Sequence, residues 1–158
     1  ITSGALFMLV GFLYDRRHTR RISDVGGLKK SMPLYAGIFL FTSFASIGLP
    51  GLNGFVGEFM ILMGSFPSFK ILSSIAAFGV VLAAIYMLWA YQRIFNGQLN
   101  NDENAVLTDL NSKELVAVGP LLILMVFIGV YPSFVESYIV NDVSIIYDAI
   151  NSLSGGLE

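Results

Sequence analysis

The sequence of 158 residues contains no cysteine and a single histidine, His18. Without cysteine there are no disulfide bonds, thiolate catalysts or thiolate-bound iron–sulfur clusters, and one histidine makes a histidine-rich metal site implausible. Nine Lys and Arg residues stand against eleven Asp and Glu residues, so the basic excess that nucleic-acid binding requires is missing. We therefore expect no metal site and no nucleic-acid partner, and any chemistry must use carboxylates, amines, hydroxyls or backbone groups.

Charge is also scarce, and apolar residues are abundant. Charged residues make up 13% of the chain, where a soluble domain has about a quarter, and the mean hydropathy is +0.73. No Asp, Glu, Lys or Arg occurs over residues 71–92 or 115–135. Each gap matches one helical crossing of a bilayer. The sequence predicts an all-α polytopic transmembrane bundle, with helices over 71–93 and 115–134.

A third apolar segment, over residues 33–66, predicts a broken helix. Glu58 is its only carboxylate or amine, and the segment is too long for one straight crossing. It contains the cluster GLPGLNG at residues 48–54, and we place the break at Gly48, Leu49, Pro50 and Gly51. The Gly and Pro residues alone are also compatible with a simple kink.

The two ends of the chain predict partial or peripheral helices. Residues 1–14 are apolar but shorter than the about 20 residues that a span needs, and they lack the features of a signal peptide. We expect the chain to be a C-terminal fragment that begins partway along a helix.

Residues 135–153 predict an amphipathic helix, because apolar residues recur every three or four positions. The stripe consists of Val135, Ile139, Val143, Ile146, Ile150 and Leu153, and the charges are Glu136, Asp142 and Asp148. A helix on anionic lipid is usually rich in Lys and Arg, so we expect it to dock on a protein surface. The alternative is a frayed helix lying loosely on the membrane.

The basic residues predict the orientation of the chain in the membrane. Loop 15–30 contains six of them and the loop between the last two spans contains Arg93 and Lys113, whereas the turn near Pro67 contains only Lys70. By the positive-inside rule, loop 15–30 and loop 92–114 face the cytoplasm and the C-terminal tail faces the other side.

Glu58 is the strongest candidate functional residue. A carboxylate within a span costs about 2.5–3.5 kcal/mol on insertion scales, so such residues usually face a bundle interior or a water-filled cavity. Non-helical backbone in a membrane also survives only against protein or internal water, and the break lies close by. We expect Asn53 to cap the second half-helix and Glu58 to act as a proton relay. The simpler alternatives are that Glu58 lies closer to the membrane interface or that it pairs with a neighbouring helix.

Other polar residues are weaker candidates. Thr42, Ser43 and Ser46 precede the break, where their hydroxyls can bind freed carbonyls or water, although hydroxyls in membrane helices more often bond their own backbone. His18 lies among arginines and is expected to be a solvated surface group. Asp15 indicates a local ion pair with the adjacent arginines.

The run GLPGLNGFVGEF at residues 48–59 resembles the broken helix of the antiporter-like membrane subunits of respiratory complex I, the proton-translocating NADH:quinone oxidoreductase. The segments GALF at 4–7, LYDR at 13–16, HTR at 18–20 and GGL at 26–28 resemble the subunit M, or chain 4, branch in its bacterial form. The Leu-Pro-Gly element is shared with related cation/proton antiporter subunits, whereas the Tyr-Asp-Arg and His-Thr-Arg segments favour complex I.

This resemblance implies a fourteen-helix subunit of two inverted repeats, of which this chain contains the end of helix eleven, broken helix twelve, helices thirteen and fourteen, and an amphipathic helix. Glu58 matches the acidic residue of helix twelve, a proposed terminal station of the proton path. The family's lysine on the other broken helix and its Glu–Lys pair are absent, so this fragment is not expected to pump protons alone.

The resemblance also implies the partners and location of the chain. We expect other membrane subunits of complex I and the lipid bilayer as partners, in a bacterial inner membrane. NADH and quinone would be handled by other subunits, so this chain would bind no cofactor and perform no redox chemistry. The alternatives are a subunit of a multi-subunit cation/proton antiporter and, from another class, a structural membrane anchor.

Overall fold

The computed structural model describes residues 1–99 and 102–154, and in α7 it leaves the side chains of residues 141–142 and 148–154 undescribed. The described residues form helices and no strand, which confirms the all-α prediction. The elements are α1 (Thr2–Arg17), the 3-10 helix η1 (Ile22–Asp24), α2 (Pro33–Ser46), α3 (Asn53–Ser65), α4 (Lys70–Phe95), α5 (Asp102–Ala105), α6 (Ser112–Val130) and α7 (Pro132–Ser154).

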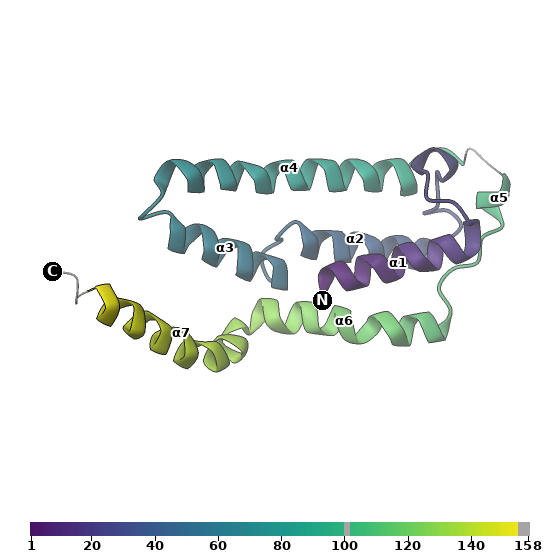
Figure 1. Ribbon diagram of the computed structural model, residues 1–158. Helices are drawn as coiled ribbons and strands as arrows, with labels where there is room; N and C mark the ends of the chain where they lie inside the picture. Colours follow the sequence, from purple (N-terminus) through teal and green to yellow (C-terminus); the bar gives the residue numbers. More distant parts are fainter. Residues whose placement is uncertain (100–101, 155–158) are drawn as a thin grey trace.

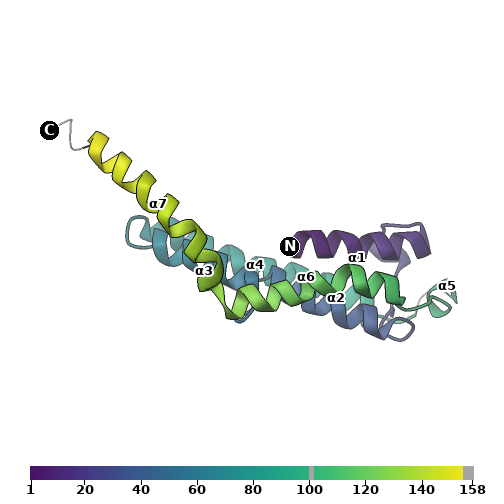
Figure 2. The same cartoon turned by 90° about the horizontal axis from the view of Figure 1, so that it is seen from below.

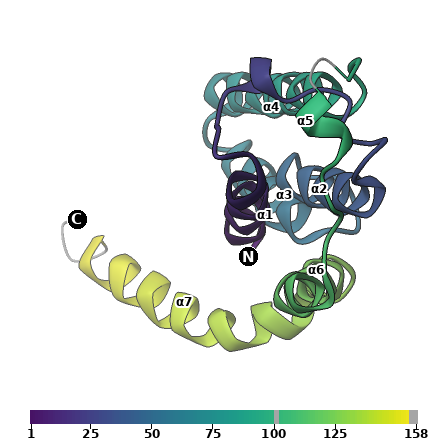
Figure 3. The same cartoon turned by 90° about the vertical axis from the view of Figure 1, so that its right-hand side faces the viewer.

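The bundle is built around the broken helix. Figure 1 shows α2 and α3 following each other end to end, with α4 running along one side and α6 along the other. The end-on view in Figure 3 places α1, α2 and α3 between α4 and α6. By length and composition, α4 and α6 are each long and apolar enough to cross a membrane. Helices α2 and α3 have 14 and 13 residues, so each is about half to two thirds of a span.

Two apolar cores hold these helices together. The larger core lies toward the end of the bundle that carries the loop after α1, and it is made of Leu9, Val25, Leu28, Met32, Tyr35, Ala36, Phe39, Tyr91, Phe95, Leu110 and Val118. The smaller core lies near the break and consists of Ala5, Ala45, Leu52 and Met125. The loop after α1 also caps the C-terminal end of α4, because the backbone N–H groups of Leu28 and Lys29 donate to the carbonyls of Ile94 and Phe95, both at 3.2 Å.

The last two helices have different bounds from those expected. A capping box starts α6 at Ser112, because the Asn111 side chain accepts from the Glu114 amide and the Glu114 side chain accepts from the Asn111 amide. Helix α6 ends at Val130, before the end expected at residue 134. Pro132 has no N–H to continue it and takes the first position of α7 instead.

Helix α7 leaves the bundle at an angle (Figure 2). Its apolar stripe is open, since Val135, Ile139, Val143 and Ile146 are between 36% and 59% exposed. The side chains of Ile150, Leu153, Asp142 and Asp148 lie outside the described residues. The expected docking of this stripe on a protein surface stays a prediction.

Candidate functional site

The break begins where α2 ends in a left-handed residue. Gly48 has φ +74°, a conformation that glycine adopts without the strain that a Cβ causes. The Leu49 N–H donates to the Phe44 carbonyl at 3.0 Å, the six-to-one hydrogen bond of a Schellman motif. This motif turns the chain away from the axis of α2, so the interruption is a real helix end and not a kink.

The next four residues form a tight turn. The Leu52 N–H donates to the Leu49 carbonyl at 3.1 Å, and Gly51 between them has φ +90°. Proline followed by a left-handed glycine at the two central positions is the signature of a type II turn. The structure therefore places the interruption at Gly48, Leu49, Pro50 and Gly51, and α3 starts directly afterwards.

The Glu58 carboxylate lies against this break. Glu58 is half-buried in the second turn of α3. A Cβ built on Gly48 would lie 2.5 Å from Oε2 of Glu58, so the carboxylate rests on the bare backbone of Gly48. Among the residues that the structure describes, no basic side chain forms an ion pair with Glu58. The acid and the interrupted backbone thus form one site.

The expected capping role of Asn53 is wrong. The N-cap of α3 is Leu52, which has extended backbone, and no side chain caps this end. Asn53 is instead the first residue of the helix, and its side-chain Oδ1 accepts a hydrogen bond from the Thr2 hydroxyl at 3.1 Å. Asn53 therefore joins α3 to α1 on the side of the break.

The hydroxyls before the break do not bind its freed carbonyls. Thr42 Oγ1 donates to the Ile38 carbonyl and Ser43 Oγ donates to the Phe39 carbonyl, both at 2.8 Å. Both side chains are fully buried and bond their own helix, the alternative that the sequence analysis left open. Ser46 is half-buried in the last position of α2, beside the break.

His18 lies apart from the break, at the far end of α1. It caps the C-terminus of α1 with φ 49° and ψ 22°, and its amide donates to the Tyr14 carbonyl at 2.7 Å. The side chain is exposed, as expected for a surface group, with its ring edge on to Tyr14. In the same loop, hydrogen bonds from Thr19 and Ser23 lower the pKa of Asp24.

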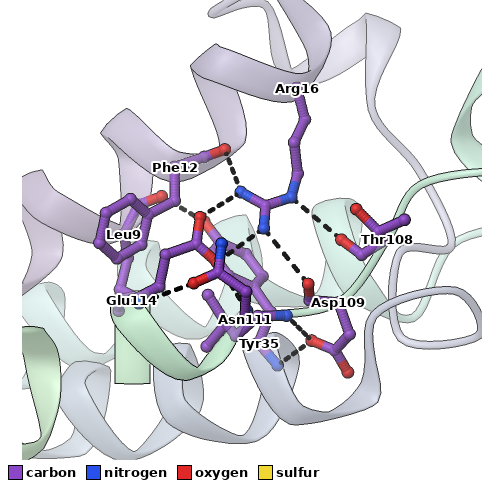
Figure 4. Close-up of polar contacts among 9 residues, drawn as sticks. Leu9, Phe12, Arg16, Tyr35, Thr108, Asp109, Asn111 and Glu114 are labelled. Carbon is purple, nitrogen blue, oxygen red and sulfur yellow. Dashed lines mark hydrogen bonds and ion pairs between the residues drawn. The ribbon is translucent and has the colours of Figure 1, made fainter. Parts of the chain in front are cut away.

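A second polar cluster, which sequence reasoning missed, joins three helix ends (Figure 4). Arg16 and Glu114 form a bidentate ion pair, with both N–O distances 2.7 Å. The remaining N–H groups of Arg16 donate to the carbonyls of Phe12, Thr108 and Asp109 at 2.9, 3.0 and 3.2 Å. All five guanidinium donors are therefore used, and α1 is fixed to the start of α6. We call these residues the Arg16–Glu114 clamp.

Asp109 extends the clamp to α2. Its carboxylate accepts from the backbone N–H groups of Leu34 and Tyr35 at 2.8 and 2.9 Å, which are orphan donors in the first turn of α2. The buried Tyr35 hydroxyl donates to the Leu9 carbonyl of α1 at 2.8 Å. The sequence contains one visible sign of this arrangement, the capping-box pattern of Asn111 and Glu114.

The local ion pair expected around Asp15 is wrong. Arg16 and Arg17 instead reach across the fold to Glu114 and Glu103. Because these partners lie 98 and 86 residues away in sequence, spacing gave no sign of them.

An all-helical apolar bundle with a carboxylate on the backbone of a broken helix is typical of ion-translocating membrane proteins. Residues 1–85 match the family described as NADH:quinone oxidoreductase/Mrp antiporter, TM, and the chain belongs to this transmembrane family.

Several relatives are members of respiratory complex I. The chain is 44% identical over 137 residues to NADH-quinone oxidoreductase subunit M of Rhodobacter capsulatus and 42% identical over 132 residues to NADH-ubiquinone oxidoreductase chain 4 of Arabidopsis thaliana. These matches cover 87% and 84% of this chain and 27% of each relative, so the chain spans about a quarter of their length. The resemblance to the subunit M, or chain 4, branch is confirmed.

A solved structure is similar as well. A chain of respiratory complex I from Thermus thermophilus with bound NADH matches with a TM-score of 0.76 and 33% identity, over 85% of this chain and 28% of that chain. The arrangement of helices described above is thus similar to that of part of a complex I subunit.

Proposed function

We propose that this chain is part of a proton-translocating membrane subunit of NADH:quinone oxidoreductase. In this proposal, Glu58 takes up and releases a proton at the break between α2 and α3, which we call the proton station. The observation that carries the proposal is the contact between the Glu58 carboxylate and the backbone of Gly48 at the break. A membrane carboxylate at interrupted backbone has neighbouring peptide groups that water can reach, which suits a group that exchanges protons.

The chain's own residues supply the station and its surroundings. Residues 47–52 lie between α2 and α3, so some of their backbone groups lack helical hydrogen bonds, and water can bind such groups beside Glu58. Among the described residues, no basic side chain forms an ion pair with Glu58. Charge movements that accompany electron transfer in other subunits would drive proton transfer at Glu58, and this chain would perform no redox step.

The partners follow from the same proposal. The chain would assemble with other membrane subunits of complex I in a bacterial inner membrane, surrounded by lipid. NADH and quinone would bind elsewhere, and this chain would hold no cofactor. Loop 15–30 would face the cytoplasm, since it contains six of the nine basic residues.

A cation/proton antiporter subunit is the second candidate, because the matched family includes Mrp antiporters. The two functions differ in what drives ion movement. In a complex I subunit, proton transfer requires electron transfer from NADH to quinone, whereas an antiporter exchanges sodium for protons without either.

Inside-out membrane vesicles that contain the complex with the full-length subunit test this proposal. We expect NADH to acidify the vesicle interior in sodium-free buffer, as a pH-sensitive dye reports, and a quinone-site inhibitor to abolish the signal. Vesicles whose complex lacks the subunit serve as the control. Sodium-driven proton movement in the absence of NADH would contradict the proposal and support the antiporter.

A further inference from the structure

Helix α6 lies directly on the break, and a glycine makes this contact. Figure 1 shows the C-terminal half of α6 running beside the junction of α2 and α3. A Cβ built on Gly129 would lie closer than 3.0 Å to three backbone atoms, the carbonyl C and O of Gly51 and Cα of Leu52. The two backbones therefore touch with no room for a side chain between them.

In a membrane, this contact shields backbone groups of the break from lipid. The turn at the break leaves backbone groups outside any helix, and lipid cannot form hydrogen bonds with them. A neighbouring helix covers such a segment closely only where its residue is small. Gly129 thus lets α6 shield the Gly51 side of the break, while Glu58 lies on the Gly48 side.

Helix α6 is anchored to the rest of the bundle at two places. At its start, Glu114 is held by the Arg16–Glu114 clamp. One turn before Gly129, Met125 is fully buried in the smaller core together with Leu52. A side chain at position 129 must therefore displace the turn itself, and Leu52 in that turn is the N-cap of the helix that carries Glu58.

We propose that Gly129 is a positioning residue for the proton station, because its contact with Gly51 and Leu52 fixes where α3 starts and hence where Glu58 meets Gly48. This inference rests on the function proposed above. Gly129 itself exchanges no proton and acts only through the backbone of the break.

The test measures protons translocated per NADH oxidised by the purified, reconstituted complex with Gly129→Ala in the full-length subunit. Gly119→Ala is the matched control, because it makes the same change on α6 where a Cβ meets nothing within 4 Å. We expect Gly129→Ala to lower the ratio at least about threefold and to alter its pH profile, since small misplacements of reacting groups cost large factors. A purely packing role would reduce the yield of complex and leave the ratio per complex unchanged.

Comparison with Glu58→Gln separates the positioning role of Gly129 from the proposed function. If Gly129→Ala has the same ratio and pH profile as Gly119→Ala, while Glu58→Gln loses translocation, the positioning role is overturned and the proposed function stands. If Glu58→Gln keeps the wild-type ratio, both fall.

If Gly129→Ala does not assemble, Met125→Ala replaces it. This variant loosens α6 against Leu52 without steric overlap, and Leu124→Ala is its control because Leu124 is 41% exposed on the same helix. A reduced ratio in Met125→Ala alone supports the inference, and equal ratios in the two variants overturn it.

Discussion

Replacing Glu58 with Gln in the full-length subunit is expected to reduce proton translocation per assembled complex by roughly tenfold or more. Gln has nearly the same shape, so it keeps the contact with Gly48, but its amide cannot release a proton to water. Carboxylates that transfer protons typically contribute factors of about 10² to 10⁴ to a rate, which sets the scale of the loss. The measurement is the initial rate of NADH-driven acidification, normalised to the amount of assembled complex.

Glu136→Gln is the matched control for this variant, since it makes the same chemical change in α7, outside the broken helix. We expect it to translocate protons as the wild type does. A structural anchor would behave differently, because Glu58→Gln would then reduce assembly or thermal stability and leave translocation per complex unchanged. That result would remove Glu58 from the proton path.

Breaking the Arg16–Glu114 clamp is expected to have the largest effect on stability. Both side chains are only 14% exposed, so Glu114→Gln leaves a largely buried guanidinium without its counter-charge. Removing one partner of a buried pair typically costs about 3–5 kcal/mol, and the partial exposure here places the effect near the lower figure. The measurement is the thermal unfolding temperature of the reconstituted complex, together with the amount of subunit that assembles.

The double variant Arg16→Met with Glu114→Leu tests whether the charge or the shape matters. An apolar pair of similar volume leaves no isolated charge, but it loses the contact of Glu114 with the Asn111 amide and leaves three backbone carbonyls without the Arg16 donors. We therefore expect it to be destabilised about as much as Glu114→Gln, and a clearly smaller loss would show that the isolated charge dominates. Arg16→Lys is expected to be intermediate, because an ammonium group cannot make the two parallel bonds to the carboxylate. An unchanged unfolding temperature in Glu114→Gln would contradict this account of the clamp.

The helix break was predictable from the sequence because its chemistry is local. Gly48 and Gly51 supply the positive φ angles, and Pro50 between them stops the helix, so three residues within four positions determine the turn. Charge-free gaps likewise predicted α4 and α6. Helix ends were less certain, and Pro132 shows why, since a proline can end one helix and begin the next at the same place.

The polar contacts were mostly not predictable, because they join distant parts of the chain. Asn is a residue type that is common at helix N-caps. The turn nevertheless places Leu52 at the cap position, and the Asn53 side chain contacts Thr2, 51 residues earlier. Arg16 and Glu114 are 98 residues apart, and Asp109 caps a helix that starts at Pro33. Only the packing of α1, α2 and α6 brings these groups together.

Thiol labelling measures directly whether water reaches the position of Glu58 in the assembled complex. These 158 residues contain no cysteine, so Glu58→Cys can be introduced as their only thiol, in a full-length subunit whose cysteines outside this chain are replaced by serine. Thiols react with hydrophilic reagents as hydrated thiolates. Asn96→Cys at the exposed end of α4 is the reactive control, and Met125→Cys in the fully buried smaller core is the unreactive one. We expect Glu58→Cys in the assembled complex to be labelled by a small water-soluble thiol reagent at a rate closer to that of Asn96→Cys than to that of Met125→Cys. Labelling as slow as that of Met125→Cys would contradict a hydrated proton station at the break.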